Sequence, residues 1–296
     1  MFELFKRKSP SLGVREQEQG SQDRTQIANR VKSGGKPRSG SKFRAASCQS
    51  AGLERSHNED TLFVLSSLLN GVDSPISFGI YLVADGMGGH QSGEIASSLV
   101  TQSVSKSLIE KYFEVYIYDR QPFTEEDIQQ SIIAAIDDAQ ALIKRRVPGG
   151  GTTLTMAMGF DGTFFSAHIG DSRLYLIDRE GKLSLKTKDH SLVKRLVDLG
   201  EITENQAREH PQRNVLYRAL GQVDSLEPDL EKFSVEKGEK ILLCSDGLWN
   251  VVNEKELEKI LKCSGDIDQS AEALVFAANE NGGPDNISVV LVERIE

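Results

Sequence analysis

An apolar run that ends in Asp-Gly occurs twice in the chain, as Tyr81-Leu82-Val83-Ala84-Asp85-Gly86 and as Ile241-Leu242-Leu243-Cys244-Ser245-Asp246-Gly247. Each run predicts a buried strand. An aspartate at the end of such a strand projects from a rigid element, and the glycine after it lets backbone or a metal ion come close. A single Asp-Gly is also typical of a hairpin turn. The interpretation therefore depends on how many strand ends carry an aspartate.

Two further predicted strands have an aspartate at one end. Ala167-His168-Ile169-Gly170-Asp171 closes a third apolar run, and Pro284-Asp285-Asn286 precedes the last one. Carboxylates that converge raise one another's pKa unless a cation neutralises them. Hard oxygen ligands without cysteine or clustered histidine select Mg²⁺ or Mn²⁺ rather than zinc. The four strand ends therefore predict a site for two or more divalent cations.

A guanidinium and two more carboxylates stand close together in Arg55-Ser56-His57-Asn58-Glu59-Asp60. Arginine can bind two phosphate oxygens through its planar fork. Two metal ions about 3.5–4 Å apart lower the pKa of a bridging water and hold an in-line displacement at phosphorus. The pattern predicts hydrolysis of a phosphate ester by water, with Arg55 on the phosphate and without a phosphoenzyme.

Other phosphate chemistries fit the chain less well. A cysteine-based phosphatase needs an arginine six residues after the cysteine, whereas Arg55 follows Cys48 by seven. Asp266-Ile267-Asp268 resembles a phospho-aspartate motif but opens a helical segment, so we interpret it as a helix cap. Gly149-Gly150-Gly151-Thr152-Thr153 lacks the Gly-Lys-Ser/Thr of a nucleotide-binding P-loop.

Strand and helix patterns occur in blocks rather than as repeated βαβ units, which favours an α+β fold. Several strands follow one another through short turns around residues 152–186 and predict an antiparallel sheet. A single domain over residues 43–296 accounts for all the elements. The predicted strands are 61–64, 78–83, 152–158, 164–169, 173–177, 240–243 and 287–292, and the predicted helices are 93–112, 125–145, 191–199, 254–262 and 268–280.

The first 42 residues differ from the rest in composition. They contain ten basic and four acidic residues, a balance of +6, whereas the other 254 residues contain 25 basic and 40 acidic ones, a balance of −15. The stretch from residue 10 onward has hardly any large apolar side chain and buries too little surface to offset its ordering entropy. We predict a disordered basic tail over residues 1–42. It is either a solvated segment or, through its first eight residues, a weak peripheral contact to a membrane or partner.

Three features bear on compartment and partners. Cys48, Cys244 and Cys263 form neither a disulfide framework nor a Cys-x-x-Cys metal site, which favours a reducing compartment. No apolar run approaches the roughly 18 residues that span a bilayer, and Met1–Pro10 is too charged for a signal peptide. The acidic body disfavours a nucleic-acid partner and a two-metal nuclease. We expect a cytoplasmic protein without a transmembrane segment.

Six motifs, in order along residues 43–294, resemble those of the type 2C metal-dependent protein phosphatases (the PPM family) in their bacterial form. Residues 189–221 are also similar to the flap segment of that group. The six motifs are Arg55-Ser56-His57-Asn58-Glu59-Asp60, Asp85-Gly86-Met87-Gly88-Gly89-His90, Gly151-Thr152-Thr153, Gly170-Asp171-Ser172-Arg173, Cys244-Ser245-Asp246-Gly247-Leu248-Trp249 and Asp285-Asn286-Ile287-Ser288.

The resemblance implies a four-layer αββα sandwich of two antiparallel sheets, with two or three Mn²⁺ or Mg²⁺ ions at one end. It implies that Asp85 bridges two ions, helped by the Gly86 carbonyl, and that Asp246 and Asp285 complete one of the sites. Asp171 matches the position of a third, weaker metal, and Arg55 would hold the substrate phosphate. Glu59 and Asp60 would hold waters or the second ion.

One position departs from animal members, which place a histidine directly after the first Asp-Gly. Here that residue is Met87, and His90 stands at the position usual in bacterial members. Two roles for His90 stay open: it protonates the leaving group or binds substrate, or it has a structural role at the start of the next helix.

The sequence thus predicts a protein serine/threonine phosphatase that acts on phosphorylated proteins and opposes a Ser/Thr kinase, which would itself be among the substrates. The alternative is a non-catalytic regulatory or binding module on the same fold. A degenerate module should have lost carboxylates, yet all four strand-end aspartates are present.

Overall fold

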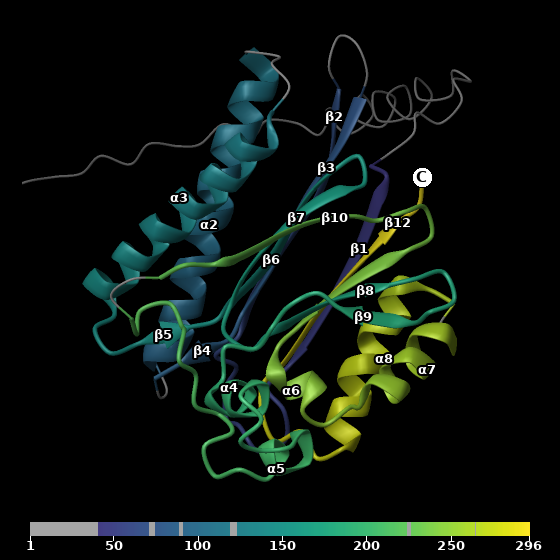
Figure 1. The fold of residues 1–296 in the computed structure, drawn as a ribbon. Coiled ribbons are helices and arrows are strands. Elements are labelled where there is room, and N and C mark those ends of the chain that lie inside the picture. Colours follow the sequence, from purple (N-terminus) through teal and green to yellow (C-terminus); the bar gives the residue numbers. More distant parts are fainter. Residues whose placement is uncertain (1–40, 71–74, 89–90, 119–122, 224–225, 264) are drawn as a thin grey trace, which may run out of the picture. The chain divides into compact units, whose positions relative to one another are not determined.

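Two five-stranded antiparallel sheets lie face to face in the computed structural model, with helices on both outer sides (Figure 1). The structure describes residues 41–70, 75–88, 91–118, 123–223, 226–263 and 265–296. These ranges confirm the α+β class and the αββα sandwich. The tail predicted over residues 1–42 lies outside the described residues except for its last two positions.

The strand order differs between the sheets. One sheet has the order β10-β7-β6-β3-β2, and the other has the order β1-β12-β11-β8-β9. A two-stranded ladder of β4 and β5 stands apart from both. The bounds are β1 Phe43–Ser50, β2 Thr61–Asn70, β3 Pro75–Ala84, β4 Gly86–Met87, β5 Gly151–Thr152, β6 Leu154–Phe160, β7 Thr163–Ile169, β8 Arg173–Ile177, β9 Leu183–Leu185, β10 Asp229–Ser234, β11 Lys240–Cys244 and β12 Ile287–Arg294.

The helices divide between the two outer faces. Helices α2 (Gln91–Tyr118) and α3 (Glu125–Arg146) cover the sheet that contains β3, and α7 (Glu254–Cys263) and α8 (Ile267–Glu280) cover the other (Figure 1). The remaining helices are short: α4 Leu192–Asp198, α5 Glu204–Arg208 and α6 Asp246–Trp249.

Side-chain alternation along the strands produces three separate hydrophobic cores. In β3, Ile80 and Leu82 pack toward α2 and α3, whereas Tyr81 and Val83 fill the space between the sheets. This follows from the two-residue period of a strand, which sends neighbouring side chains to opposite faces. The same division holds in β11 and β12, whose other face packs on α7 and α8. A strand apolar on both faces therefore identifies an inner layer.

The two-residue strand β4 was not predicted from the sequence, and neither were three longer strands, namely β1, β9 and β10. Each of these three lies at the edge of its sheet and pairs with only one neighbour. β10 reads Asp-Leu-Glu-Lys-Phe-Ser, with one buried residue in six. Such polar edge strands lack the apolar pattern that reveals central ones.

The strand run predicted around residues 152–186 divides between the two sheets. β6 and β7 form a hairpin in one sheet, while β8 and β9 belong to the other. The chain changes sheet within Gly170-Asp171-Ser172, and this crossing places Asp171 between the two inner layers. Among the described residues, no helix is both long and apolar enough to cross a membrane.

Candidate metal centre

The predicted aspartates gather at one end of the sandwich. β3 and β7 end, and β2 begins, at the same end of one sheet, while β11 ends where β12 and β8 begin in the other. The short crossing from β7 to β8 joins these two ends. Asp85, Asp171, Asp246 and Asp285 therefore lie around one edge, together with Asp60 just before β2.

Hydrogen bonds to one buried asparagine hold the Arg55–Asp60 loop against this edge. Asn286 is 6% exposed; its Oδ1 accepts from the backbone N–H of Glu59 at 2.8 Å. Its Nδ2 donates to the carbonyls of His57 at 2.9 Å and Ala51 at 3.0 Å. Sequence analysis singled out the motif around Asn286 but gave this side chain no role. A polar residue between Asp285 and an apolar strand is the only local signal of it.

Of the two carboxylate oxygens of Asp60, one is held by hydrogen bonds and the other has none among the described residues. Its Oδ2 accepts hydrogen bonds from the hydroxyls of Ser245 at 2.8 Å and Ser288 at 2.7 Å. Its Oδ1 is buried and has no hydrogen-bond partner among the residues that the structure describes. Because buried polar atoms are almost always satisfied, an orphaned carboxylate oxygen beside other carboxylates is the kind of atom that a cation would satisfy.

Asp85 is held through its backbone. Its N–H donates to Thr153 Oγ1 at 2.9 Å, and its carbonyl accepts from Thr152 Oγ1 at 2.8 Å and from the N–H of Thr153 at 2.9 Å. Gly86 follows in β4 and pairs with Thr152. A Cβ on Gly86 would overlap the backbone carbonyls of Gly93 and Glu59, so only glycine fits there.

The carboxylates interact strongly through their charges. Burial raises the pKa of Asp85 well above its usual range, and the charges of Asp60 and Asp246 raise it further. Burial and then the charges of Asp171 and Asp285 raise the pKa of Asp246 in the same way. Burial also raises the pKa of Asp60 to about 6, although its serine hydrogen bonds act in the opposite direction. Asp60, Asp85, Asp171 and Asp246 thus share one poorly solvated space with an excess of negative charge, and the partly exposed Asp285 lies at its border.

Asp171 also has a raised pKa, and Trp249 holds its backbone in place. Burial, followed by the charge of Asp189, raises its pKa to about 7. Its backbone carbonyl accepts from Trp249 Nε1 at 2.9 Å, and the Arg173 guanidinium lies 3.6 Å from the centre of that indole ring. Trp249 packs at the rim of the core under α7 and α8 and also holds the Asp171 loop.

The remaining predicted residues stand at the border of this cluster. Arg55 is exposed, and its Nη2 lies 2.7 Å from Asp285 Oδ2. The Glu59 carboxylate contacts His57 Nε2 at 3.2 Å and reaches toward Gly93 at the start of α2. His90 lies outside the described residues. Within the described ranges, no group of three or more Asp, Glu, His or Cys side chains is arranged to hold a metal ion as it stands.

A family profile described as "Protein phosphatase 2C" matches residues 56–278. The chain belongs to the protein phosphatase 2C family. It is a serine/threonine protein phosphatase, as the six motifs predicted, and the non-catalytic alternative is not supported.

Bacterial relatives of this phosphatase are similar over most of its length. It is 37% identical to the serine/threonine phosphatase stp of Listeria innocua over 243 residues, covering 82% of this chain and 92% of the relative. It is 34% identical to the serine/threonine protein phosphatase PstP of Mycobacterium tuberculosis, covering 86% of this chain and 45% of that protein.

Solved structures agree with the fold of this phosphatase. The Streptococcus agalactiae serine/threonine phosphatase superposes with a TM-score of 0.72 at 29% identity, covering 85% of this chain and 99% of that one. The catalytic domain of PstP, solved in complex with two manganese ions, has a TM-score of 0.67 at 31% identity and covers 86% of this chain and 99% of that one. The family is metal-dependent, which agrees with the carboxylate cluster.

Proposed function

We propose that this phosphatase hydrolyses phosphoserine and phosphothreonine in proteins at the cluster of Asp60, Asp85, Asp171, Asp246 and Asp285, with two or three Mn²⁺ or Mg²⁺ ions bound there. The observation that carries the proposal is the convergence of five aspartates on one edge of the sandwich, where Asp60 and Asp171 are buried and Asp60 Oδ1 has no hydrogen-bond partner among the described residues. Cations relieve the repulsion between converging carboxylates, and hard oxygen donors suit Mn²⁺ and Mg²⁺. Rotation of these side chains on binding would complete the coordination.

The structure supports a division of roles among the ligands. Asp85 lies close to both Asp60 and Asp246, since after burial the charges of these two carboxylates do most to raise the pKa of Asp85. This central position suits a bridge between two ions, with the Gly86 carbonyl beside it. Asp246 and Asp285 would complete one ion, while Asp60, through its free Oδ1, and Glu59 would serve the second. Asp171, in the crossing between the sheets, would hold a third.

Arg55 is the proposed phosphate-binding residue. It is exposed and attached through one contact to Asp285, so its planar fork can exchange that carboxylate for phosphate oxygens. Bound Mn²⁺ or Mg²⁺ would supply an activated water as the nucleophile and would stabilise the charge on the phosphoryl oxygens. His90 is proposed to protonate the leaving serine or threonine oxygen.

The proposed setting is the cytoplasm, with phosphorylated proteins as substrates and a Ser/Thr kinase among them. The three cysteines, Cys48, Cys244 and Cys263, are all free thiols, which supports a reducing compartment. Relatives named serine/threonine phosphatases support phosphorylated proteins as substrates. The basic tail would add at most a weak peripheral contact.

The decisive experiment measures hydrolysis of a phosphothreonine peptide with Mn²⁺, with and without chelator. We expect chelation and Asp246→Asn each to lower kcat/KM by at least about a hundredfold. Asp137→Asn, on the exposed side of α3, is the matched control and should keep wild-type activity. Mn²⁺ titration by calorimetry should show fewer or weaker sites in Asp246→Asn. Activity that survives both chelation and the substitution would overturn the metal mechanism.

His90 needs its own test. We expect His90→Ala to lower kcat by more than it weakens Mn²⁺ binding, because a proton donor does not hold the ions. Unchanged kinetics would exclude a chemical role.

A further inference from the structure

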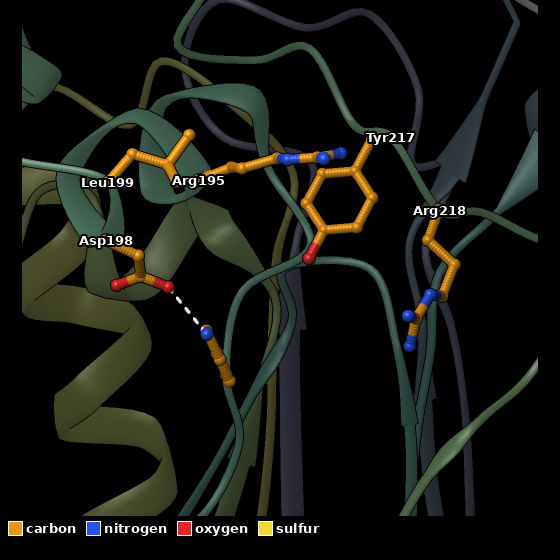
Figure 2. A pocket seen from close by; sticks show the side chains of 6 residues that line it. Arg195, Asp198, Leu199, Tyr217 and Arg218 are labelled. Carbon is orange, nitrogen blue, oxygen red and sulfur yellow. Dashed lines mark ion pairs between the residues drawn. The ribbon is translucent and has the colours of Figure 1, made fainter. Parts of the chain in front are cut away.

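A pocket of about 330 Å³ opens beside helix α4. Figure 2 shows the side chains of Arg195 and Arg218 on either side of the Tyr217 ring, with an ion pair below them. All but one of the lining residues lie in the segment 189–221, which resembles the flap of the family. The pocket is lined by Lys188, Arg195, Asp198, Leu199, Tyr217 and Arg218.

Positive charge prevails in this pocket, in a chain that is otherwise acidic. Lys188 is bound to Asp198 at 2.6 Å, and Arg218 is bound to Asp229 at 2.7 Å. Arg195 has no ion pair among the described residues; its guanidinium carbon lies 5.8 Å from the centre of the Tyr217 ring. Arg195 therefore offers an uncommitted planar cation that an aromatic ring already orients.

The pocket is connected to the Asp171 side of the metal centre. Arg218 Nη1 lies 3.2 Å from Nε2 of His190, and Nδ1 of the same ring accepts a hydrogen bond from the N–H of Gly170 at 3.0 Å. The His190 N–H in turn donates to the Gly170 carbonyl at 2.7 Å. One imidazole and two contacts thus separate Arg218 from the residue before Asp171, so the Arg218 side of the pocket lies roughly 10 Å from Gly170, and Arg195 lies on the far side of the Tyr217 ring from Arg218 (Figure 2).

This spacing matches a few residues of a bound peptide. An extended chain advances about 3.3 Å per residue, so the Arg218 side of the pocket would meet a side chain about three residues from the phosphoresidue and Arg195 would meet one about four to six residues from it. A phosphopeptide is anionic, and the acidic body of the protein repels it at longer range. A cationic pocket at this distance would offset the repulsion for substrates with a second negative charge.

We propose that the pocket binds an acidic or second phosphorylated side chain of the substrate, and that Arg195 makes the ion pair. Tyr217 holds the plane of the guanidinium, so that its two N–H groups can meet both oxygens of a carboxylate or phosphate. The proposal rests on the proposed function, because it takes the cluster around Asp171 as the place of hydrolysis.

The test compares phosphothreonine peptides that carry Ala or Glu about four, five or six residues before or after the phosphoresidue, hydrolysed by the full chain with Mn²⁺. For at least one of these placements, wild type should prefer Glu over Ala by about threefold to tenfold in kcat/KM, as expected for a partly exposed ion pair of good geometry. Arg195→Ala should bring this ratio to about one, whereas the exposed Arg208→Ala in α5 should retain it. The preference should also shrink in 0.5 M NaCl.

Equal kcat/KM for Ala and Glu peptides in wild type, or a preference that survives Arg195→Ala, would refute the proposed binding of an acidic side chain by Arg195. If wild type hydrolyses none of the peptides, the proposed function is wrong instead. The pocket is then judged by fluorescence anisotropy of the labelled peptides in chelator. Tighter binding of a Glu peptide that Arg195→Ala removes would support it, and equal affinities would overturn it.

Discussion

Replacement of Asn286 by alanine tests how the substrate loop is attached to the metal centre. The side chain makes three hydrogen bonds, to Glu59 N–H and to the carbonyls of His57 and Ala51, at 2.8–3.0 Å. Each bond contributes about 1 kcal/mol, and a buried partner left unsatisfied costs about 1–3 kcal/mol. Because the loop is half-buried and water can reach part of it, we expect a total loss of about 2–4 kcal/mol in the free energy of unfolding.

Urea unfolding in chelator measures this loss without a contribution from bound metal. Asn281→Ala is the matched control, because its side chain is exposed and donates only to the Val251 carbonyl at 3.1 Å and, weakly, to Glu256 Oε2 at 3.5 Å among the described residues; its effect should stay below about 1 kcal/mol. The Asn286 variant should remain folded, since domains have about 5–15 kcal/mol of stability. It should nevertheless lose about a hundredfold in kcat/KM, as a loop displaced by about 1 Å does.

Two results would contradict this reasoning. If Asn286→Ala is no less stable than Asn281→Ala, the three hydrogen bonds do not stabilise the position of the Arg55–Asp60 loop. If stability falls but kcat/KM does not, the loop that contains Arg55 and Glu59 has no part in the reaction.

Three further substitutions test other parts of the site. Burial and the charge of Asp189 raise the pKa of Asp171 to about 7, so the folded state gains stability from the bound proton below about pH 4 and loses it as the pH rises through 7. In chelator, Asp171→Asn should therefore be more stable than wild type by about 1–3 kcal/mol at pH 8 and by much less at pH 5; a difference that is equal at the two pH values refutes the assignment. Trp249→Phe should cost about 1 kcal/mol in unfolding free energy, because the Asp171 carbonyl loses its N–H donor, and an unchanged urea midpoint speaks against that bond. Gly86→Ala should cost more than about 2 kcal/mol, since its Cβ overlaps two backbone carbonyls, whereas Gly265→Ala, with nothing within 4 Å, should be neutral in the same thermal melt.

The central strands could be predicted because the sequence pattern is local. Strands such as β3 and β11 are apolar on both faces, and each was predicted within a few residues of its bounds. The helix predicted over residues 125–145 corresponds to α3, which starts with a capping box in which Thr124 Oγ1 accepts from the Asp127 N–H at 3.1 Å. The edge strands β1, β9 and β10 were missed because their outer sides face water and carry polar residues, whereas the more apolar edge strand β2 was predicted over its first four residues.

Residue types and their order determined the chemistry of the site. Asp85, Asp171, Asp246 and Asp285 are recognisable because a carboxylate at the end of a buried strand is unusual, and the six motifs around them specify the family. No local pattern reveals the supports of these residues, since Asn286, Ser245 and Ser288 make contacts over 200 or so positions of sequence, such as the 2.7 Å bond from Ser288 to Asp60.

Only the tertiary structure decided which charges share one space. The sequence determined that the strand-end aspartates exist, because strand period and apolar content are properties of neighbouring residues. The crossing from β7 to β8 at Asp171, the orphaned Oδ1 of Asp60 and the cationic pocket around Arg195 arise from the packing of distant segments. Charge repulsion and desolvation depend on distance in space and not on distance along the chain, so these features become visible only after the two sheets are placed face to face.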